Sequence, residues 1–149
     1  MDAIDPVLEF QHDHAELNQL VRDLGALVRG ATPATQTELV AQLGELREHL
    51  FLHFAREEEG LFPHVAAALP ALADEVATMV TAHDAICGAV ARMHHLTSTG
   101  ALEQLPALYD RFELSYTLHA RSERGFLQDI GERLSPTQRA ELLVLVRGL

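Results

Sequence analysis

Lysine is absent from the sequence, and cysteine occurs once, at Cys87. A single cysteine cannot form a disulfide within the chain, so burial of apolar side chains must stabilise the fold, and a lone thiol is typical of a reducing compartment. At 149 residues the chain has the length of one domain, which can bury roughly two-thirds of the surface that its unfolded chain exposes. We therefore expect a single domain over residues 1–149.

Positive charge and long apolar runs are also scarce. The 11 basic residues are all arginine, and 22 acidic residues outnumber them, so the formal net charge is −11. Nucleic acids and anionic membrane surfaces are excluded as partners, because both bind clustered cations. The N-terminal segment MDAIDPVLEF has neither the basic start nor the apolar run of a secretory signal, and no later stretch is apolar enough to span a bilayer. These absences predict a cytoplasmic protein.

Alternating β-branched residues are rare, and apolar residues instead return every three or four positions, as in helices. Proline and glycine positions divide this pattern into segments. The expected helices cover about residues 6–29, 35–69, 70–98, 101–134 and 136–147. Pro63 should kink the second helix or end it near Phe62, because proline lacks a backbone donor. Four long helices with short connectors predict an all-α, up-down-up-down four-helix bundle at about residues 6–134, followed by a short C-terminal fifth helix.

Nine histidines are present, and histidine is the commonest side-chain metal ligand. On the first expected helix, His14 shares a face with Phe10 and Leu17, because residues three or four apart lie on the same side of a helix. On the third, His83 shares a face with Ile86. These two histidines are therefore predicted to point into the bundle.

Two further helices carry a histidine and a glutamate one turn apart on their apolar faces. The pairs are His53 with Glu57 and His119 with Glu123. A spacing of four residues stacks the two side chains on one side of the helix, where both can reach the same metal or two neighbouring metals. A buried glutamate also predicts a cation beside it, because an unpaired buried carboxylate is costly.

A rise of about 1.5 Å per residue brings these six side chains to one level of an antiparallel bundle, within a turn. The alternative is a plain helical bundle in which the histidines are hydrogen-bonded core residues. Four inward imidazoles with two carboxylates favour a pair of metal ions instead, and mixed nitrogen and oxygen donors suit iron or manganese better than zinc.

The segment from His53 to Pro63 reads HFAREEEGLFP. It resembles the H-x-x-x-E-E-x-x-L-F-P signature of the hemerythrin-like, or HHE cation-binding, domain family. His14 in the sequence His-Asp-His-Ala-Glu-Leu is similar to the first-helix ligand of that family, and His83 in Ala-His-Asp is similar to its third-helix ligand. The pair His119 and Glu123 resembles the fourth-helix ligands, so the resemblance covers about residues 7–130.

The resemblance implies two iron ions, with manganese less suitable, bridged by two glutamates and by an oxo or hydroxo group. The implied metal ligands are His14, His53, Glu57, His83, His119 and Glu123. Family oxygen carriers have a second histidine one turn after the third-helix ligand, where this sequence has Cys87. Four histidines with two glutamates are similar to the iron-sulfur cluster repair proteins of the family, which carry an additional N-terminal region not found in this sequence.

Several other residues are candidates for completing the coordination. His49 and His94 could each supply a fifth imidazole at the edge of the layer, while Tyr116 and Cys87 could act as ligands or pack in the core. Glu58 is expected to face solvent or to contact a ligand from behind. An apolar shell should limit solvent access to the metals. Its expected members are Val21, Leu50, Met79, Ile86, Phe112 and Phe126.

Three functions are compatible with such a centre. The first is binding or sensing of a diatomic ligand, dioxygen or nitric oxide, and a sensor would need a protein partner to pass on the signal. The second is an enzyme that acts on peroxide or nitric oxide, or an iron donor for iron-sulfur cluster repair. The third is iron storage or a structural role, which predicts no spectral change on ligand addition.

Overall fold

The computed structural model describes residues 6–147, apart from the side chains of residues 8, 9, 12, 146 and 147. All regular structure in this range is helical, without a strand. The α-helices are α1 (Pro6–Arg29), α2 (Gln36–Arg56), α3 (Phe62–Ala68), α4 (Ala73–Ser98), α5 (Leu105–Arg133) and α6 (Pro136–Arg147). Short 3₁₀ turns at Pro33–Thr35, Pro70–Leu72 and Leu102–Gln104 lead into α2, α4 and α5. The expected all-helical bundle is confirmed.

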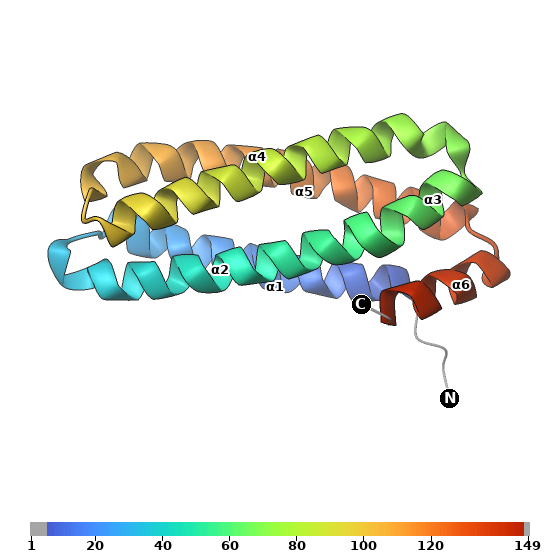
Figure 1. Ribbon diagram of the computed structural model, residues 1–149, viewed down its shortest axis with the longest axis horizontal. Coiled ribbons are helices and arrows are strands. Elements are labelled where there is room, and N and C mark those ends of the chain that lie inside the picture. The colour runs from blue at the N-terminus through green and yellow to red at the C-terminus, as the bar shows by residue number, and fades with distance from the viewer. Residues whose placement is uncertain (1–5, 148–149) are drawn as a thin grey trace.

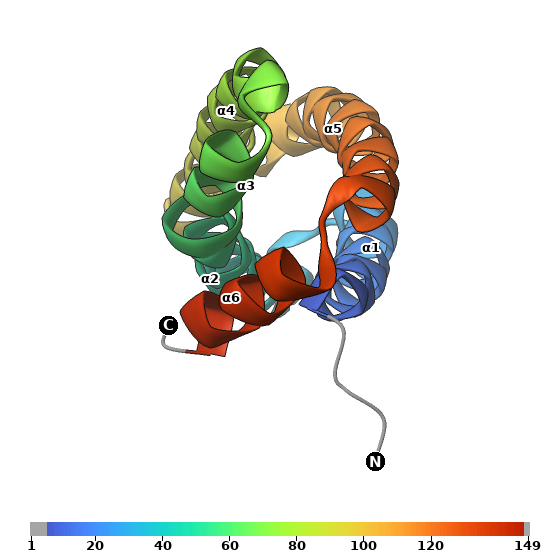
Figure 2. The same cartoon turned by 90° about the vertical axis from the view of Figure 1, so that its right-hand side faces the viewer.

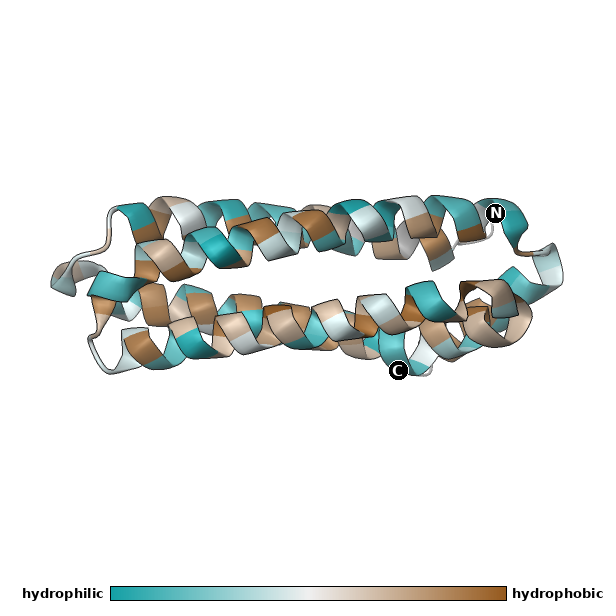
Figure 3. Cartoon of the chain, turned by 90° about the horizontal axis from the view of Figure 1, so that it is seen from above, coloured by the Kyte–Doolittle hydropathy of each residue, from teal (hydrophilic) through white to brown (hydrophobic). Residues whose placement is uncertain are grey.

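The long helices α1, α2, α4 and α5 lie side by side around a common axis (Figures 1 and 2). Contacts join α1 with α2, α2 with α4, α4 with α5, and α5 with α1. Helix α6 crosses the end of the bundle where α1 begins and contacts α1 and the segment between α2 and α3. Hydrophobic and hydrophilic residues alternate along each long helix, as expected of amphipathic helices (Figure 3). None of the described helices is long and apolar enough to cross a membrane.

The second expected helix differs from its prediction in one respect. Helix α2 continues at Arg56 into a π-helical segment, Glu57–Leu61, and then into α3. The amide of Phe62 donates to the carbonyl oxygen of Glu57, five residues earlier, which is the π-helical hydrogen bond. Pro63 follows immediately and has no amide hydrogen to donate. The disturbance lies where the proline predicted it, but it widens the helix instead of ending it.

Two hydrophobic clusters form the core. The larger contains Leu17, Leu50 and Ile86, while the smaller, at the α6 end, contains Phe10, Leu61 and Phe126. Buried histidines and glutamates of α2, its π-helical extension, α4 and α5 separate the two clusters. All six members of the expected apolar shell are buried. The bundle thus contains one polar layer between two apolar ones.

Candidate metal centre

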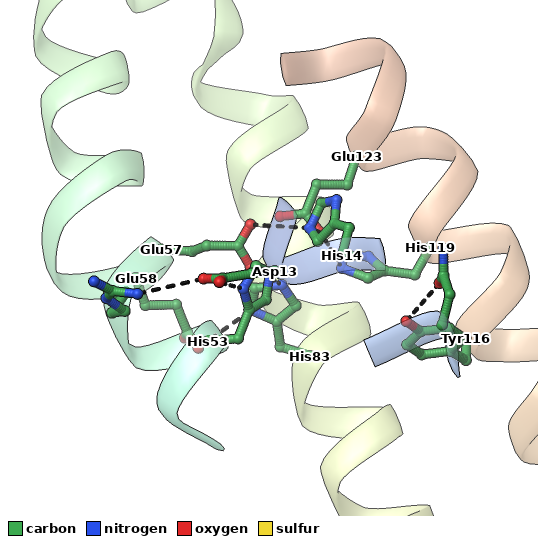
Figure 4. A network of polar contacts seen from close by, with 11 residues as sticks. Asp13, His14, His53, Glu57, Glu58, His83, Tyr116, His119 and Glu123 are labelled. Carbon is green, nitrogen blue, oxygen red and sulfur yellow. Dashed lines mark hydrogen bonds and ion pairs between the residues drawn. The ribbon is translucent and has the colours of Figure 1, made fainter. Parts of the chain in front are cut away.

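The polar layer brings together all six side chains that the sequence singled out (Figure 4). They come from α1, α2, the π-helical segment, α4 and α5. Five of them are buried, and the sixth, His14, has a side chain that is 14% exposed. The six residues are His14, His53, Glu57, His83, His119 and Glu123. Side chains from all four long helices therefore converge at one level.

These residues form two groups. In the first, His14, His53, Glu57 and Glu123 each offer a ligand atom, and these atoms all lie within 4.8 Å of one another. In the second, ligand atoms of His83, His119 and Glu123 likewise all lie within 4.8 Å of one another. Glu123 therefore belongs to both groups.

Each carboxylate contacts histidines of both groups. One oxygen of Glu57, Oε1, lies 3.2 Å from Nε2 of His53 and 3.3 Å from Nε2 of His83. One oxygen of Glu123, Oε2, lies 3.2 Å from Nε2 of His14 and 2.9 Å from Nε2 of His119. Each glutamate thus lies between a histidine of one group and a histidine of the other.

These atoms approach one another at 2.9–3.3 Å, but the contacts lack hydrogen-bond geometry, so the buried ligand atoms have no hydrogen-bond partner among the described residues. Nε2 of all four histidines, both carboxylate oxygens of Glu57 and Oε1 of Glu123 fall in this class. Buried polar groups are normally hydrogen-bonded, and each orphaned group is costly. A core of hydrogen-bonded histidines would satisfy these atoms, so their orphaned state argues against that alternative. Their donor chemistry fits a bound cation.

Burial and neighbouring charges set the protonation states of these groups. Burial lowers the pKa of His14 and of His119 to about 4, so both rings are neutral at pH 7. Burial alone would raise the pKa of Glu57, but contacts with His53 and His83 outweigh it and lower the pKa to about 2. Burial disfavours charge on His53 as well, yet Asp13 and Glu57 raise its pKa to about 9. His53 must therefore release a proton when it binds a metal.

Two carboxylates stand behind the histidines. Oε2 of Glu58 lies 3.3 Å from Nδ1 of His83, so the expected contact from behind a ligand is present. Oδ2 of Asp13 lies 3.6 Å from Nδ1 of His53 and 3.3 Å from Nη1 of Arg56. Sequence reasoning missed Asp13, because its position depends on how α1 faces α2. The signal in the sequence was that Asp13 directly precedes His14. A residue next to an inward-facing one lies at the edge of that face, where it can reach a neighbouring helix.

The remaining candidates lie outside the two groups. His49 lines a hollow next to His53, and His94 lies beside Gly44. Cys87 lines a different hollow beside His83. The hydroxyl of Tyr116 donates to Oδ1 of Asn18 at 2.8 Å. Neither group contains His49, His94 or Cys87.

Aromatic rings wall the α4 side of the layer. The ring of Phe54 stacks on His83 with a centroid distance of 3.7 Å and an interplanar angle of 9°, and Phe62 lies 5.6 Å from the same imidazole. On the opposite side, a hollow of about 400 Å³ between α1 and α5 reaches His14 and is lined by Asn18 and Arg124. Surface hollows thus reach the layer on both sides, at His14 and, beside these rings, at His83.

Comparison with known proteins agrees with this geometry. A family model described as the hemerythrin HHE cation binding domain matches residues 5–128. Searches among curated proteins and among solved structures give no significant match. The matched segment contains all six residues of the polar layer. The chain therefore belongs to the hemerythrin HHE cation-binding domain family.

Proposed function

We propose that this chain is a cytoplasmic, non-haem di-iron protein that binds or senses dioxygen or nitric oxide. In this proposal residues 1–149 form one domain with the up-down-up-down four-helix arrangement of hemerythrin and a short C-terminal helix. The observation that carries the proposal is the set of buried, unpartnered Nε2 and carboxylate oxygen atoms in two groups that share Glu123. Such a set favours bound cations, and its mixed nitrogen and oxygen donors suit iron first and manganese second.

The six residues of the polar layer would hold the two irons. Glu57 and Glu123 would bridge them, since each carboxylate contacts histidines of both groups. Two six-coordinate irons need more ligands than these residues provide, so the bound pair would supply an open, redox-active coordination position. An oxo or hydroxo group would complete the bridge.

The surrounding side chains would decide what reaches the centre. Phe54 and Phe62 pack on the buried ring of His83, and the apolar clusters above and below exclude bulk solvent. An apolar surrounding of this kind raises the cost of charge separation and tunes a metal site. Small uncharged molecules can still diffuse through such packing, which favours a diatomic gas as the ligand. A sensor of this kind would pass its signal to a partner protein.

A second function is favoured by the residue that stands one turn after His83. Cys87 occupies that position and lines a surface hollow, and neither group contains it. Without a further imidazole there, the metals would keep more open coordination positions for reaction or release. The alternative proposal is therefore an enzyme that acts on peroxide or nitric oxide, or an iron donor for iron-sulfur cluster repair.

The decisive experiment is metal analysis of the aerobically purified protein, with its optical spectrum. We expect about two irons per chain and oxo-bridge charge-transfer bands. Exposure of the reduced protein to dioxygen or nitric oxide should change the spectrum reversibly, whereas consumption of peroxide or nitric oxide would favour the enzyme. A protein that stays colourless and metal-free after anaerobic reconstitution with ferrous iron would contradict both proposals.

The matched variants are Glu57→Gln and Glu59→Gln. Glu57 is buried and contacts both groups, so its amide should abolish binding of both irons, because a neutral amide oxygen is a poor bridge. Glu59 belongs to the same π-helical segment but is exposed, so its variant should keep both irons. Equal iron content in the two variants would exclude Glu57 as a bridge.

A further inference from the structure

Two carboxylates outside the six proposed ligands each stand behind a different histidine (Figure 4). Asp13 lies on α1 and approaches Nδ1 of His53 at 3.6 Å. Glu58 lies on the π-helical segment and approaches Nδ1 of His83 at 3.3 Å. Both carboxylates have side chains that are 34% exposed, so they reach the histidines from the bundle surface. The inward face of the same rings is Nε2, which points toward Glu57.

A carboxylate behind an imidazole fixes which nitrogen carries the proton. An ionised carboxylate only accepts hydrogen bonds, so the nitrogen that faces it must donate. Nδ1 of His83 then donates to Glu58, and Nε2 presents its lone pair to the centre. For His53, Nδ1 is buried without a partner at hydrogen-bond distance, and Asp13 is the acceptor beside it. A shift of a few tenths of an ångström would close that bond.

Arg56 holds Asp13 in place. Its Nη1 lies 3.3 Å from Oδ2 of Asp13, the same oxygen that faces His53. The contact links α1 to α2 at the level of the polar layer. The guanidinium of Arg56 thus holds the Asp13 carboxylate in the position where it faces the imidazole of His53.

The two histidines with a carboxylate behind them belong to different groups. His53 is in the group with His14, and His83 is in the group with His119. We propose that Asp13 and Glu58 are positioning residues, one for each metal, that orient His53 and His83 and so set how tightly each metal is held. This inference rests on the proposed di-iron centre and adds that its two metals are supported separately.

The competing explanation is that both carboxylates are ordinary surface charges. Asp13 and Arg56 are each about one-third exposed, and ion pairs of that kind contribute little to stability. Under this explanation, removing the charge would leave the affinity of both metals unchanged. A positioning role predicts the reverse, since partners behind metal-bound histidines typically change metal affinity by about 10- to 100-fold.

The experiment is an anaerobic competition between the protein and a chelator for ferrous iron. We expect Asp13→Asn and Glu58→Gln each to weaken one of the two irons by about 10- to 100-fold, while the other keeps its affinity. Asp13→Glu should restore part of the loss, because it keeps the acceptor. The controls are Glu16→Gln, which lines the same hollow as Asp13, and Glu59→Gln, and both should bind iron like the wild type.

A His119→Ala background assigns each effect to one metal. This substitution removes a ligand of the smaller group and should leave one iron, held by the group with His14. Asp13→Asn should weaken that remaining iron, whereas Glu58→Gln should change its affinity by less than about twofold. The metal-free Asp13 and Glu58 variants should still unfold in one cooperative transition, so a lost iron cannot be attributed to a failure to fold.

Each outcome decides between the explanations. A wild type that binds two irons, with variants that keep both affinities or lose both equally, would overturn the paired positioning role and leave the di-iron proposal standing. A wild type that binds no iron would overturn the proposed function and this inference together. Loss of one iron in each variant, with assignment to opposite groups, is the result expected.

Discussion

Each histidine and glutamate of the polar layer occupies a core position where an apolar residue would cost less free energy to bury. Glu57 has both carboxylate oxygens buried without a hydrogen-bond partner among the described residues. Without a metal, that carboxylate lies next to His53, whose pKa is raised to about 9, so this ring is protonated at pH 7. The metal-free protein therefore depends on charge states that pH can change.

Acid should destabilise the metal-free protein. Burial lowers the pKa of His14 and of His119 to about 4, so the unfolded chain, with pKa values near 6.5, binds protons more readily. The free energy of unfolding should then fall between about pH 6.5 and pH 4, by about 3 kcal/mol for each of the two groups. Urea titrations in the presence of a chelator would measure this slope.

The free energy of unfolding of the metal-free protein should also fall in alkali, through His53. The pKa of His53 is raised, so its contribution to stability is complete below pH 6.5 and is lost as the pH rises through about 9.

The control for the acid prediction is the variant His14→Gln. It should lose about half of the fall in unfolding free energy between pH 6.5 and 4. A stability that stays constant over this range would mean that the two rings are not buried in their neutral form.

Residue-level prediction from sequence worked where one helix contained the whole signal. Glu57 and Glu123 stand out because each follows a histidine by four residues on an apolar face. Asp13 does not, because its neighbours His53 and Arg56 lie on another helix. A spacing rule within one helix cannot detect a contact that depends on how two helices face each other.

At the level of the helices, local signals fixed most of the boundaries. Helix α1 ends at Arg29, the boundary expected from the sequence, with Gly30 directly after it, and Gly100 has a positive φ of 81° in the turn before α5. The π-helical segment was not predicted. A π turn and an α turn use the same residues and differ by one position in their hydrogen bonds, so their relative energy depends on packing around Glu57 and on Pro63.

Two glycines test the packing of the helices against each other. A Cβ added to Gly25 would lie 2.7 Å from Cζ of Tyr109 on α5, and the tyrosine hydroxyl donates to the carbonyl of Val21 at 2.7 Å. Gly25→Ala should therefore destabilise the protein by about 1–3 kcal/mol, because α1 and α5 cannot move apart without breaking that bond. Thermal unfolding followed by circular dichroism would measure it.

The matched control is Gly88→Ala on α4. A Cβ there would meet no atom within 4 Å, so only helix propensity changes. Alanine in a helix interior is more stable than glycine by about 0.5–1 kcal/mol, and the melting temperature should rise. A loss of stability in both variants would indicate that substitution in the helices is harmful in general and not through contact with Tyr109.

On the scale of the whole molecule, α6 covers the smaller hydrophobic cluster. Leu142 is fully buried in that cluster, which also contains Leu61 of the π-helical segment. Leu142→Ala should cost about 2–5 kcal/mol through lost burial and the cavity left behind. Val144, on the same helix but 73% exposed, gives the control Val144→Ala, which should change stability by less than about 0.5 kcal/mol. Urea unfolding of both variants distinguishes a structural α6 from a loosely attached one.

The sequence indicated the helical bundle and the level of the polar layer, because periodicity reports which side of each helix is buried. It could not indicate that α6 would contact the segment carrying Glu57, since an amphipathic terminal helix can pack on many surfaces. Sequence patterns specify what each helix must bury, and the choice of neighbour follows from the shapes of all helices together.

The polar layer also determines how the helices align lengthwise. A bundle with an entirely apolar core could slide one helix by a turn, about 5.4 Å, and bury nearly the same area. In this molecule such a slip would press a histidine or glutamate of the layer against leucines and phenylalanines of the adjacent cluster, away from its partners. Only one register keeps all six side chains level. The residues proposed to hold iron thus select a single alignment of the bundle from several that are otherwise close in energy.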